Sequence, residues 1–409
     1  MLLGIITIII LLIGITISVT IHEAGHTFTA KAFGVPVSEF MVGFGPTLIS
    51  KKIGETVYGF KPILLGGYSK ILGMFPPAGK KWKDKGPFAK MIKEVRQESA
   101  QTLPEGQEAR AFYWLSTPKK VIVMAGGTLM NLLLGFIFFA LAFCSIGAFR
   151  ASTTVDSIVP CTTDSSTCAP ENYSPAQKAG LKSGDKIISL NGEQINSWSD
   201  ITNIVSNSNG KQMEIAFSPE GSDYQVRAEI TPYPTSSGYK VGILSRQARQ
   251  PGNLGDAANI TWQAFSGTVQ MIATLPYQTY KAVSSIFTHE VRTGNGVLSL
   301  VGVGQIAVDQ TASTNDNLSR IASMLSLLGS LNIALFVLNL IPLLPLDGGH
   351  VVNALYEGSV RLSAKVRGKK RPAPSDLARS MPLAYFVYGI LIFCAIALIL
   401  VDIVNPIQL

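Results

Sequence analysis

The residues best suited to chemistry are two histidines and a glutamate near the start of the chain, His22, Glu23 and His26. On a helix, His22 and His26 lie one turn apart on the same face, and Glu23 flanks that face. In a His-Glu-x-x-His motif the two imidazoles bind zinc and the glutamate acts on a metal-bound water. The spacing therefore predicts a site for one zinc ion.

The motif follows an apolar run, Leu2–Ile21, that is long enough to span a bilayer as a helix. Ionisable residues inside a membrane are costly and point to function. Two plainer explanations are a polar cluster at the membrane interface and a signal peptide. A signal peptide is disfavoured because the run has no basic start, exceeds the usual length and has no small-residue cleavage site before His22. A metal site is the favoured interpretation.

Composition indicates a polytopic α-helical membrane protein, since 47% of the residues are hydrophobic and only 15% are charged. Four apolar runs each meet the length of a spanning helix. The runs are Leu2–Ile21, Val121–Phe149, Ile321–Leu346 and Met381–Val401. We therefore predict four transmembrane helices.

The distribution of charge sets the expected orientation. The net charge of +8 would suit a nucleic-acid partner, but the basic residues are concentrated in two segments. Lys and Arg outnumber Asp and Glu by 15 to 7 in residues 30–120 and by 7 to 2 in residues 356–380, whereas residues 151–321 have 11 against 14. By the positive-inside rule the first two segments are cytoplasmic and the third is outside. We expect a multi-pass protein of the plasma membrane, in contact with lipid and not with nucleic acid.

Cysteine usage agrees with this orientation. Cys144 and Cys394 lie within predicted spans and are interpreted as small apolar residues. Cys161 and Cys168 lie in the external segment, where an oxidising compartment allows disulfides to persist. We predict that Cys161 and Cys168 pair and close a small loop.

Residues 34–75 contain β-forming pieces separated by glycines such as Gly43 and Gly45, a pattern that predicts hairpins. The segment is too apolar for an ordinary cytoplasmic loop. Irregular backbone at membrane depth is tolerated only against protein or a wet cavity. Two alternatives are open: a hairpin that re-enters the membrane towards the metal, and a small cytoplasmic sheet.

The second predicted span contains a polar residue, Asn131, after a run of small residues. A buried amide needs a hydrogen-bonding partner. A neighbouring helix is the favoured partner and a bound substrate is the alternative.

The external segment contains residues 174–193, which resemble part of a PDZ domain through glycines placed between a short helix and strands. Alternating apolar positions in residues 213–217 and 226–230 supply further strands. PDZ domains bind peptides by adding a strand to a sheet edge. The alternative is a domain that binds no peptide and restricts access to the site sterically.

A catalytic zinc site normally has three protein ligands and a water, and the first helix supplies only two. The best remaining oxygen ligand is Asp347, which ends the third apolar run beside Gly348 and Gly349. As a lone residue Asp347 could also be an interfacial cap. His350 and Glu357 are competing ligands.

These observations divide the chain into nine segments. The predicted spans are residues 1–33, 119–150, 321–355 and 381–409. The predicted β-hairpin is 34–75, the cytoplasmic loops are 76–118 and 356–380, and the external PDZ domain (α+β) and amphipathic linker are 151–250 and 251–320.

Taken together, the chain resembles the site-2 proteases, a family of intramembrane zinc metalloproteases. The likeness rests on residues 22–26, the Gly-Phe-Gly of 43–45, the Leu-Gly-Gly-Tyr of 65–68, Asn131, the single PDZ domain and residues 339–349. Residues 402–407 and the external cysteines are most like the actinobacterial branch. Many members have Gly-Pro-x-x-Asn before the second-span asparagine, whereas this chain has Gly127-Thr128-Leu129-Met130-Asn131.

The resemblance implies roles for single residues. His22, His26 and Asp347 would be the zinc ligands and Glu23 the catalytic base. Residues 43–74, including Gly43 and Gly45, would form a membrane-re-entrant hairpin that holds substrate as an added strand. Asn131 and Asn339 would contact the substrate backbone or stabilise the oxyanion.

The implied substrates are single-span membrane proteins, such as anti-sigma factors already trimmed outside, with the PDZ domain excluding untrimmed ones. The active site should lie towards the cytoplasmic face, because His22 lies about 30 Å along the first helix at 1.5 Å per residue. Two other classes compete. A metal-ion transporter explains intramembrane His and Asp but not the PDZ domain or Glu23, and a scaffold with a dead site does not explain intact ligands.

Overall fold

The computed structural model describes residues 2–77, 87–101, 106–162, 169–235, 238–288, 292, 298–313, 316–370 and 372–405. The chain divides into two compact units. The first combines Met1–Ile146 with Asn253–Leu409, and the second is Gly147–Gly252.

Four helices in the described residues are long and apolar enough to cross a membrane. They are α1 (Leu2–Ala32), α3 (Thr117–Ala140), which continues into a π-helical turn to Ile146, α9 (Asn317–Asn339) and α11 (Met381–Val404) with the 3₁₀ turn before it. Many of their Ile, Leu and Phe side chains are exposed, as expected for helices whose outer surface contacts lipid. The chain is a membrane protein.

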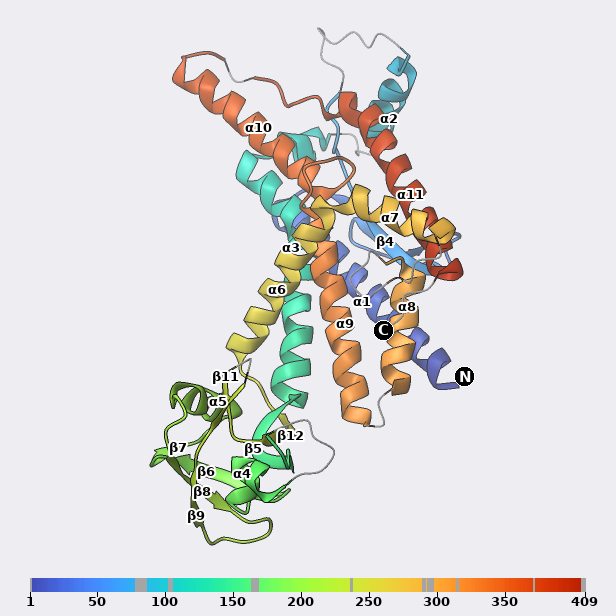
Figure 1. Ribbon diagram of the computed structural model, residues 1–409. Helices are drawn as coiled ribbons and strands as arrows, with labels where there is room; N and C mark the ends of the chain where they lie inside the picture. The colour runs from blue at the N-terminus through green and yellow to red at the C-terminus, as the bar shows by residue number, and fades with distance from the viewer. Residues whose placement is uncertain are drawn as a thin grey trace. The chain divides into compact units, whose positions relative to one another are not determined.

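Helices α1, α3 and α9 form the core of the first unit (Figure 1). Small residues let α3 and α9 approach closely. A Cβ on Gly135 would lie 2.7 Å from Ile333, and one on Gly329 would lie 2.9 Å from Phe139. The fully buried Asn332 of α9 donates to Ser18 Oγ of α1 at 2.9 Å. The three helices are therefore joined by close packing and by a buried polar contact.

The predicted third span is divided in the structure. Helix α9 ends at Asn339, and a separate helix, α10 (Asp347–Val366), begins at the aspartate. The two prolines between them have no N–H to donate, so they cannot continue the helical hydrogen bonds. Gly348 and Gly349 then pack directly on the backbone of residues 340–344, with no room for a Cβ. The break places Asp347 at the start of a helix.

Residues 251–320, predicted as an amphipathic linker, are largely helical in their described part. They form α6 (Leu254–Ala273), α7 (Leu275–Thr288) and α8 (Leu300–Ser313). Helix α6 packs on Phe139, Ile333 and Phe336 of the core. Helix α8 packs between α1 and α9, and Thr311 Oγ1 lies 3.2 Å from Thr7 Oγ1 of α1. A 14-residue helix is too short to span alone, but its apolar side can be buried beside a span.

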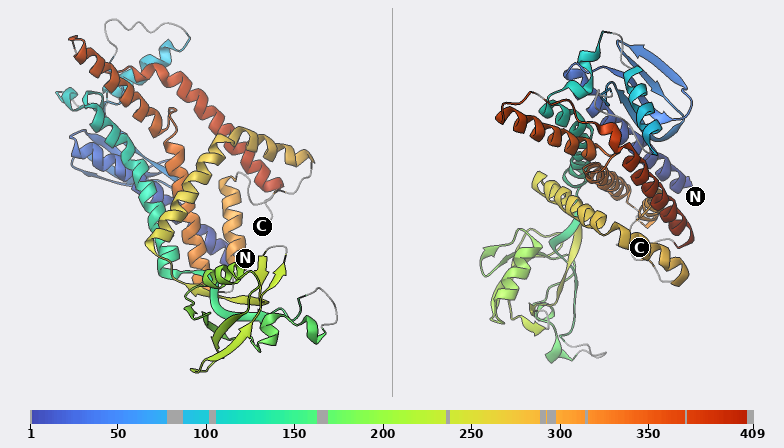
Figure 2. Two further views of the ribbon diagram at one scale, coloured as in Figure 1. Left: turned by 60° about the vertical axis from the view of Figure 1, so that its left-hand side comes forward. Right: turned by 90° about the horizontal axis from the view of Figure 1, so that it is seen from above.

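The segment predicted as a hairpin is a four-stranded mixed sheet. Its strands are β1 (Val37–Phe44), β2 (Ile49–Ile53), β3 (Thr56–Phe60) and β4 (Ile63–Ile71). The order is β2-β3-β1-β4, and only β1 and β3 run parallel. Strand β4 is an edge strand that lies along α1 (Figure 2). Gly43 has a φ of +90° at a bulge facing Ile63, a conformation that favours glycine.

Another helix of the first unit is α2 (Ala89–Gln101). The second unit contains two β-sheets and, among its described residues, two short α-helices. Its elements are β5 (Ala148–Ile158), α4 (Pro175–Lys178), β6 (Lys186–Leu190), β7 (Glu193–Gln194), α5 (Trp198–Asn207), β8 (Met213–Ser218), β9 (Val226–Ile230), β10 (Tyr233–Thr235), β11 (Gly238–Lys240) and β12 (Ile243–Gln250).

The larger sheet of the second unit has the order β12-β5-β6-β8-β9, with β7 beside β6. Val155, Ile187, Leu190, Ile215 and Ile230 form its buried core. The expected partner of Cys161, Cys168, lies outside the described residues, so their pairing stays a prediction, as does the PDZ identity of this unit.

A buried ion pair joins the end of α11 to the segment between α7 and α8. Arg292 Nη1 donates to Asp402 Oδ1 at 2.7 Å, and the Ser299 N–H donates to Asp402 Oδ2 at 2.6 Å. Both charged side chains are at most 7% exposed. The pair ties the end of α11 to the segment after α7, and α7 itself packs on Leu398 and Val401 of α11.

We expect Asp402→Asn to destabilise the protein by about 3–5 kcal/mol, because removing one partner leaves the other charge buried and unpaired. Unfolding by heat in detergent, followed by circular dichroism, measures the effect. The control is Glu94→Gln, which removes an exposed ion pair to Lys90 and should change stability by at most about 1 kcal/mol. Equal midpoints for both variants would contradict this role of Asp402.

Candidate metal centre

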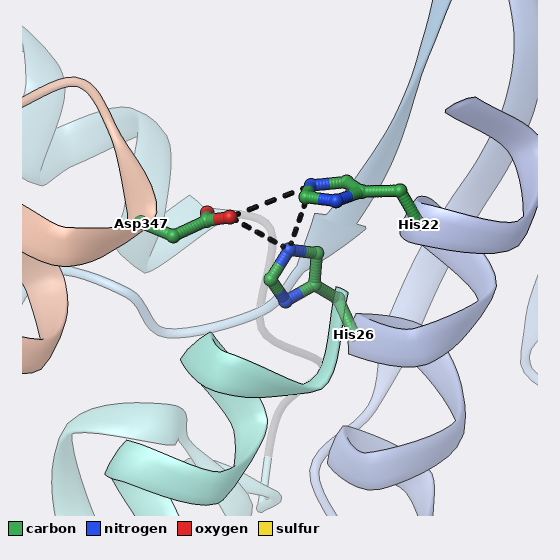
Figure 3. Close-up of side chains that lie close together, drawn as sticks. All are labelled: His22, His26 and Asp347. Carbon is green, nitrogen blue, oxygen red and sulfur yellow. Dashed lines mark hydrogen bonds and ion pairs between the residues drawn. The ribbon is translucent and has the colours of Figure 1, made fainter. Parts of the chain in front are cut away.

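Two helices bring three potential ligands together. His22 and His26 lie on successive turns of α1, and Asp347 is the first residue of α10 (Figure 3). The Nε2 atoms of the histidines are 3.2 Å apart. Asp347 Oδ2 is 3.4 Å from His22 Nε2 and 3.2 Å from His26 Nε2. The predicted third ligand thus meets the two histidines.

These separations fit a single zinc ion. Two ligand atoms that are each about 2.1 Å from zinc and subtend a tetrahedral angle lie about 3.4 Å apart. Two imidazole nitrogens and one carboxylate oxygen are a usual catalytic zinc set, which leaves a fourth position for water or substrate. The residues present therefore fit the metal that the motif predicts.

The glutamate of the motif is held by the sheet. Ser69 Oγ of β4 donates to Glu23 Oε2 at 2.8 Å. Gly67 of the same strand faces Glu23, and a Cβ there would lie 3.8 Å from Glu23 Cγ. Strand β4 therefore aims the carboxylate and stays close to it.

Helices α1 and α3 touch backbone to backbone at the metal centre. A Cβ on Gly126 would lie 2.7 Å from the Gly25 carbonyl oxygen, and one on Gly25 would overlap that of Gly126. A Cβ on Gly127 would overlap Nε2 of His26, the nitrogen that faces the other ligands, and would lie 2.7 Å from the His22 carbonyl oxygen. Only glycine fits at these positions without displacing α3.

The two competing ligands, Glu357 and His350, do not belong to the cluster of His22, His26 and Asp347. The Glu357 carboxylate is buried and accepts from Lys120 Nζ at 2.8 and 3.0 Å, so it serves as an ion-pair partner. His350 borders the same cavity as Asp347 but is not one of the clustered ligands.

Of the predicted substrate residues, Asn131 contacts a proposed metal ligand. The side-chain nitrogen of Asn131 lies 3.0 Å from His22 Nδ1, so Asn131 is at the metal centre. Asn339 ends α9, and Gly43 and Gly45 lie at the end of β1. None of these last three is among the described residues that border the cavity.

A cavity of about 390 Å³ opens beside the ligands. Its wall contains the titratable side chains of Glu23, His26 and Asp347, several apolar side chains and part of α2. The apolar and α2 residues are Ile71, Met74, Phe75, Met124, Met381, Tyr385, Val95, Glu98 and Ser99.

Sequence reasoning did not single out Ser69 or Thr128 as site residues. Thr128 Oγ1 donates to Asp347 Oδ2 at 3.1 Å, and Ser69 holds Glu23. Ser69 gives no signal in sequence, since it is one polar residue in a strand. Thr128 does give a signal in sequence, because it occupies the position of the proline in the Gly-Pro-x-x-Asn motif of many site-2 proteases.

A family model for peptidase family M50 matches residues 10–373. The chain belongs to this family. Since these are the site-2 proteases, the resemblance is confirmed, and the chain is a peptidase. It is 28% identical to the zinc metalloprotease Rip1 of Mycobacterium bovis and 26% identical to that of Mycolicibacterium smegmatis, with 98% of each chain covered. It is 28% identical to the metalloprotease MmpA of Caulobacter vibrioides, over 85% of both chains. The mycobacterial relatives agree with the actinobacterial likeness.

We expect Gly127→Ala to lower activity about 10²-fold or more and to weaken metal binding, because the methyl group displaces the His26 ring. Zinc content and peptide cleavage by the purified protein measure this. The control is Gly389→Ala in α11, where a Cβ meets nothing within 4 Å and both properties should stay at the wild-type level. Normal zinc content in Gly127→Ala would contradict the packing argument.

Proposed function

We propose that this peptidase is an intramembrane zinc metalloprotease that hydrolyses peptide bonds within or near the transmembrane helix of single-span membrane proteins. The observation that carries the proposal is the meeting of His22, His26 and Asp347 beside Glu23, on and next to a helix apolar enough to span a membrane. The zinc in the names of the relatives from Mycobacterium bovis and Mycolicibacterium smegmatis fits these residues.

The chemistry assigns each residue a task. His22, His26 and Asp347 would hold the zinc, which would lower the pKa of water at the site towards neutrality and supply a Lewis acid for the scissile carbonyl. Glu23 takes the proton of the attacking water and returns it to the leaving amine. Ser69 keeps the Glu23 carboxylate turned towards the cavity by its hydrogen bond.

The sheet supplies a place for the substrate backbone. A transmembrane helix must unwind locally before cleavage, and its freed N–H and C=O groups need partners. Strand β4 pairs only with β1 among the described strands, so no described strand is bonded to its other edge, to which the substrate would add. Ser69, Lys70 and Ile71 of β4 border the cavity. A substrate strand on this edge would pass beside Glu23, and this supports the re-entrant role of residues 34–75.

The finer substrate contacts belong to the same proposal. Asn131 lies beside the ligands, 3.0 Å from His22 Nδ1, whereas Asn339, Gly43 and Gly45 would act through the shape of the α9 end and of β1. With an extracytoplasmic N-terminus, as the charge distribution favours, the active site lies towards the cytoplasm and the second unit lies outside. Pre-trimmed anti-sigma factors are the substrates we propose.

Glu23→Gln tests the function directly. We expect cleavage to fall about 10²–10⁴-fold, because the amide cannot act as a base, while zinc stays bound. Membrane proteomes of cells with the wild type or Glu23→Gln should differ in short single-span fragments that accumulate only with the variant. Glu94→Gln, on the exposed face of α2, is the control. Equal proteomes with zinc bound in both would contradict proteolysis and favour metal transport.

The second unit generates a separate prediction. If this PDZ-like unit excludes untrimmed substrates, joining Ile146 to Asn253 through a short Gly-Ser linker should let full-length single-span proteins be cut. Cleavage of full-length and trimmed versions of one substrate, compared in the same membranes, measures the selectivity. Unchanged selectivity after the deletion would refute the filter.

A further inference from the structure

We propose that α3 holds all three metal ligands in position, each through a different group: the Val123 carbonyl for His26, Asn131 for His22 and the Thr128 hydroxyl for Asp347. This inference rests on the proposed function, because it takes the three ligands as those of zinc. It makes Asn131 and Thr128 positioning residues and not substrate contacts.

The contact between His26 and the Val123 carbonyl shows how α3 holds a ligand. An imidazole that binds a metal through Nε2 carries its proton on Nδ1. His26 Nδ1 lies 2.8 Å from the Val123 carbonyl oxygen, and both residues are buried. The Nδ1–H therefore donates to the backbone of α3. A metal-bound histidine usually has such an outer partner, which fixes the ring and its tautomer.

The same requirement applies to His22. Its Nε2 also faces the ligand cluster, so its Nδ1 carries a proton and needs an acceptor. The carboxamide of Asn131, which is only 1% exposed, lies 3.0 Å from this Nδ1. Its oxygen is buried with no hydrogen-bond partner in the described part of the chain. A half-turn of the amide brings this oxygen to His22, which is the orientation that a metal-bound His22 requires.

Thr128 completes the set. Its hydroxyl donates to Asp347 Oδ2, the oxygen nearest both histidines, and the side chain is 1% exposed. Proline, which the resembling motif has at this position, offers no hydroxyl. Thr128 and Asn131 lie three residues apart and so share one face of α3. That face meets ligands from both α1 and α10.

The experiment measures zinc affinity of the purified full-length protein in detergent by competition with a chelator, together with kcat and KM for one substrate. Thr128→Val and Asn131→Leu remove the polar groups at nearly constant volume. Thr128→Ser keeps the hydroxyl, and Asn131→Asp keeps an acceptor oxygen for His22. Leu129→Ala, at an exposed position of the same helix, is the matched control.

We expect Thr128→Val and Asn131→Leu each to weaken zinc affinity by about 10- to 100-fold, the usual loss when an outer partner of a ligand is removed. Thr128→Ser and Asn131→Asp should recover most of the affinity, and Leu129→Ala should match the wild type. With Co²⁺ in place of zinc, the visible spectrum should shift only in the two variants that lose the polar group. At saturating zinc, KM should stay constant.

Unchanged zinc affinity with a raised KM would overturn the inference and make Asn131 and Thr128 substrate contacts. Unchanged affinity with unchanged kinetics would overturn it as well. A wild type that binds no zinc would overturn the proposed function itself, so the two failures are distinguishable.

Discussion

The candidate metal centre depends on the contact of α1 and α3 at Gly25, Gly126 and Gly127. At this point the two backbones are so close that a single added methyl group would displace one helix or the His26 ring. In a membrane, where lipid is as apolar as a leucine side chain, such close packing is a main source of helix association. The contact also brings the polar groups of α3 within hydrogen-bonding distance of ligands on α1. One packing constraint thus stabilises the bundle and orients the site.

The third proposed ligand, Asp347, lies at a break between two helices. Asp347 lies more than 300 residues from the histidines in sequence and joins them because α9 stops at Asn339 and a new helix begins at Asp347. The intervening backbone packs closely against Gly348 and Gly349, where a Cβ would not fit. Strand β4 positions Glu23 through the hydrogen bond from Ser69. The proposed ligands therefore come from helices, while the proposed base is held by an edge strand.

The sequence predicts the parts of this protein that depend on local pattern. The lengths of the apolar runs predicted four spanning helices, and the four-residue spacing of His22 and His26 predicted that they share a helix face. Both predictions follow from helix geometry alone. Asp347 could be ranked above His350 and Glu357 but not separated from them, since the choice depends on Lys120, whose ion pair with Glu357 is a contact between distant segments. The parallel pairing of β1 with β3, the burial of α8 and the partner of Asn131 are likewise long-range, and no periodicity encodes them.

The most direct test of the account is zinc K-edge X-ray absorption on the purified wild-type protein. The account predicts one zinc per chain, with two imidazole nitrogens and oxygen donors at about 2.0–2.2 Å and no sulfur. Protein without zinc, or zinc bound by sulfur at about 2.3 Å, would contradict a centre built from His22, His26 and Asp347.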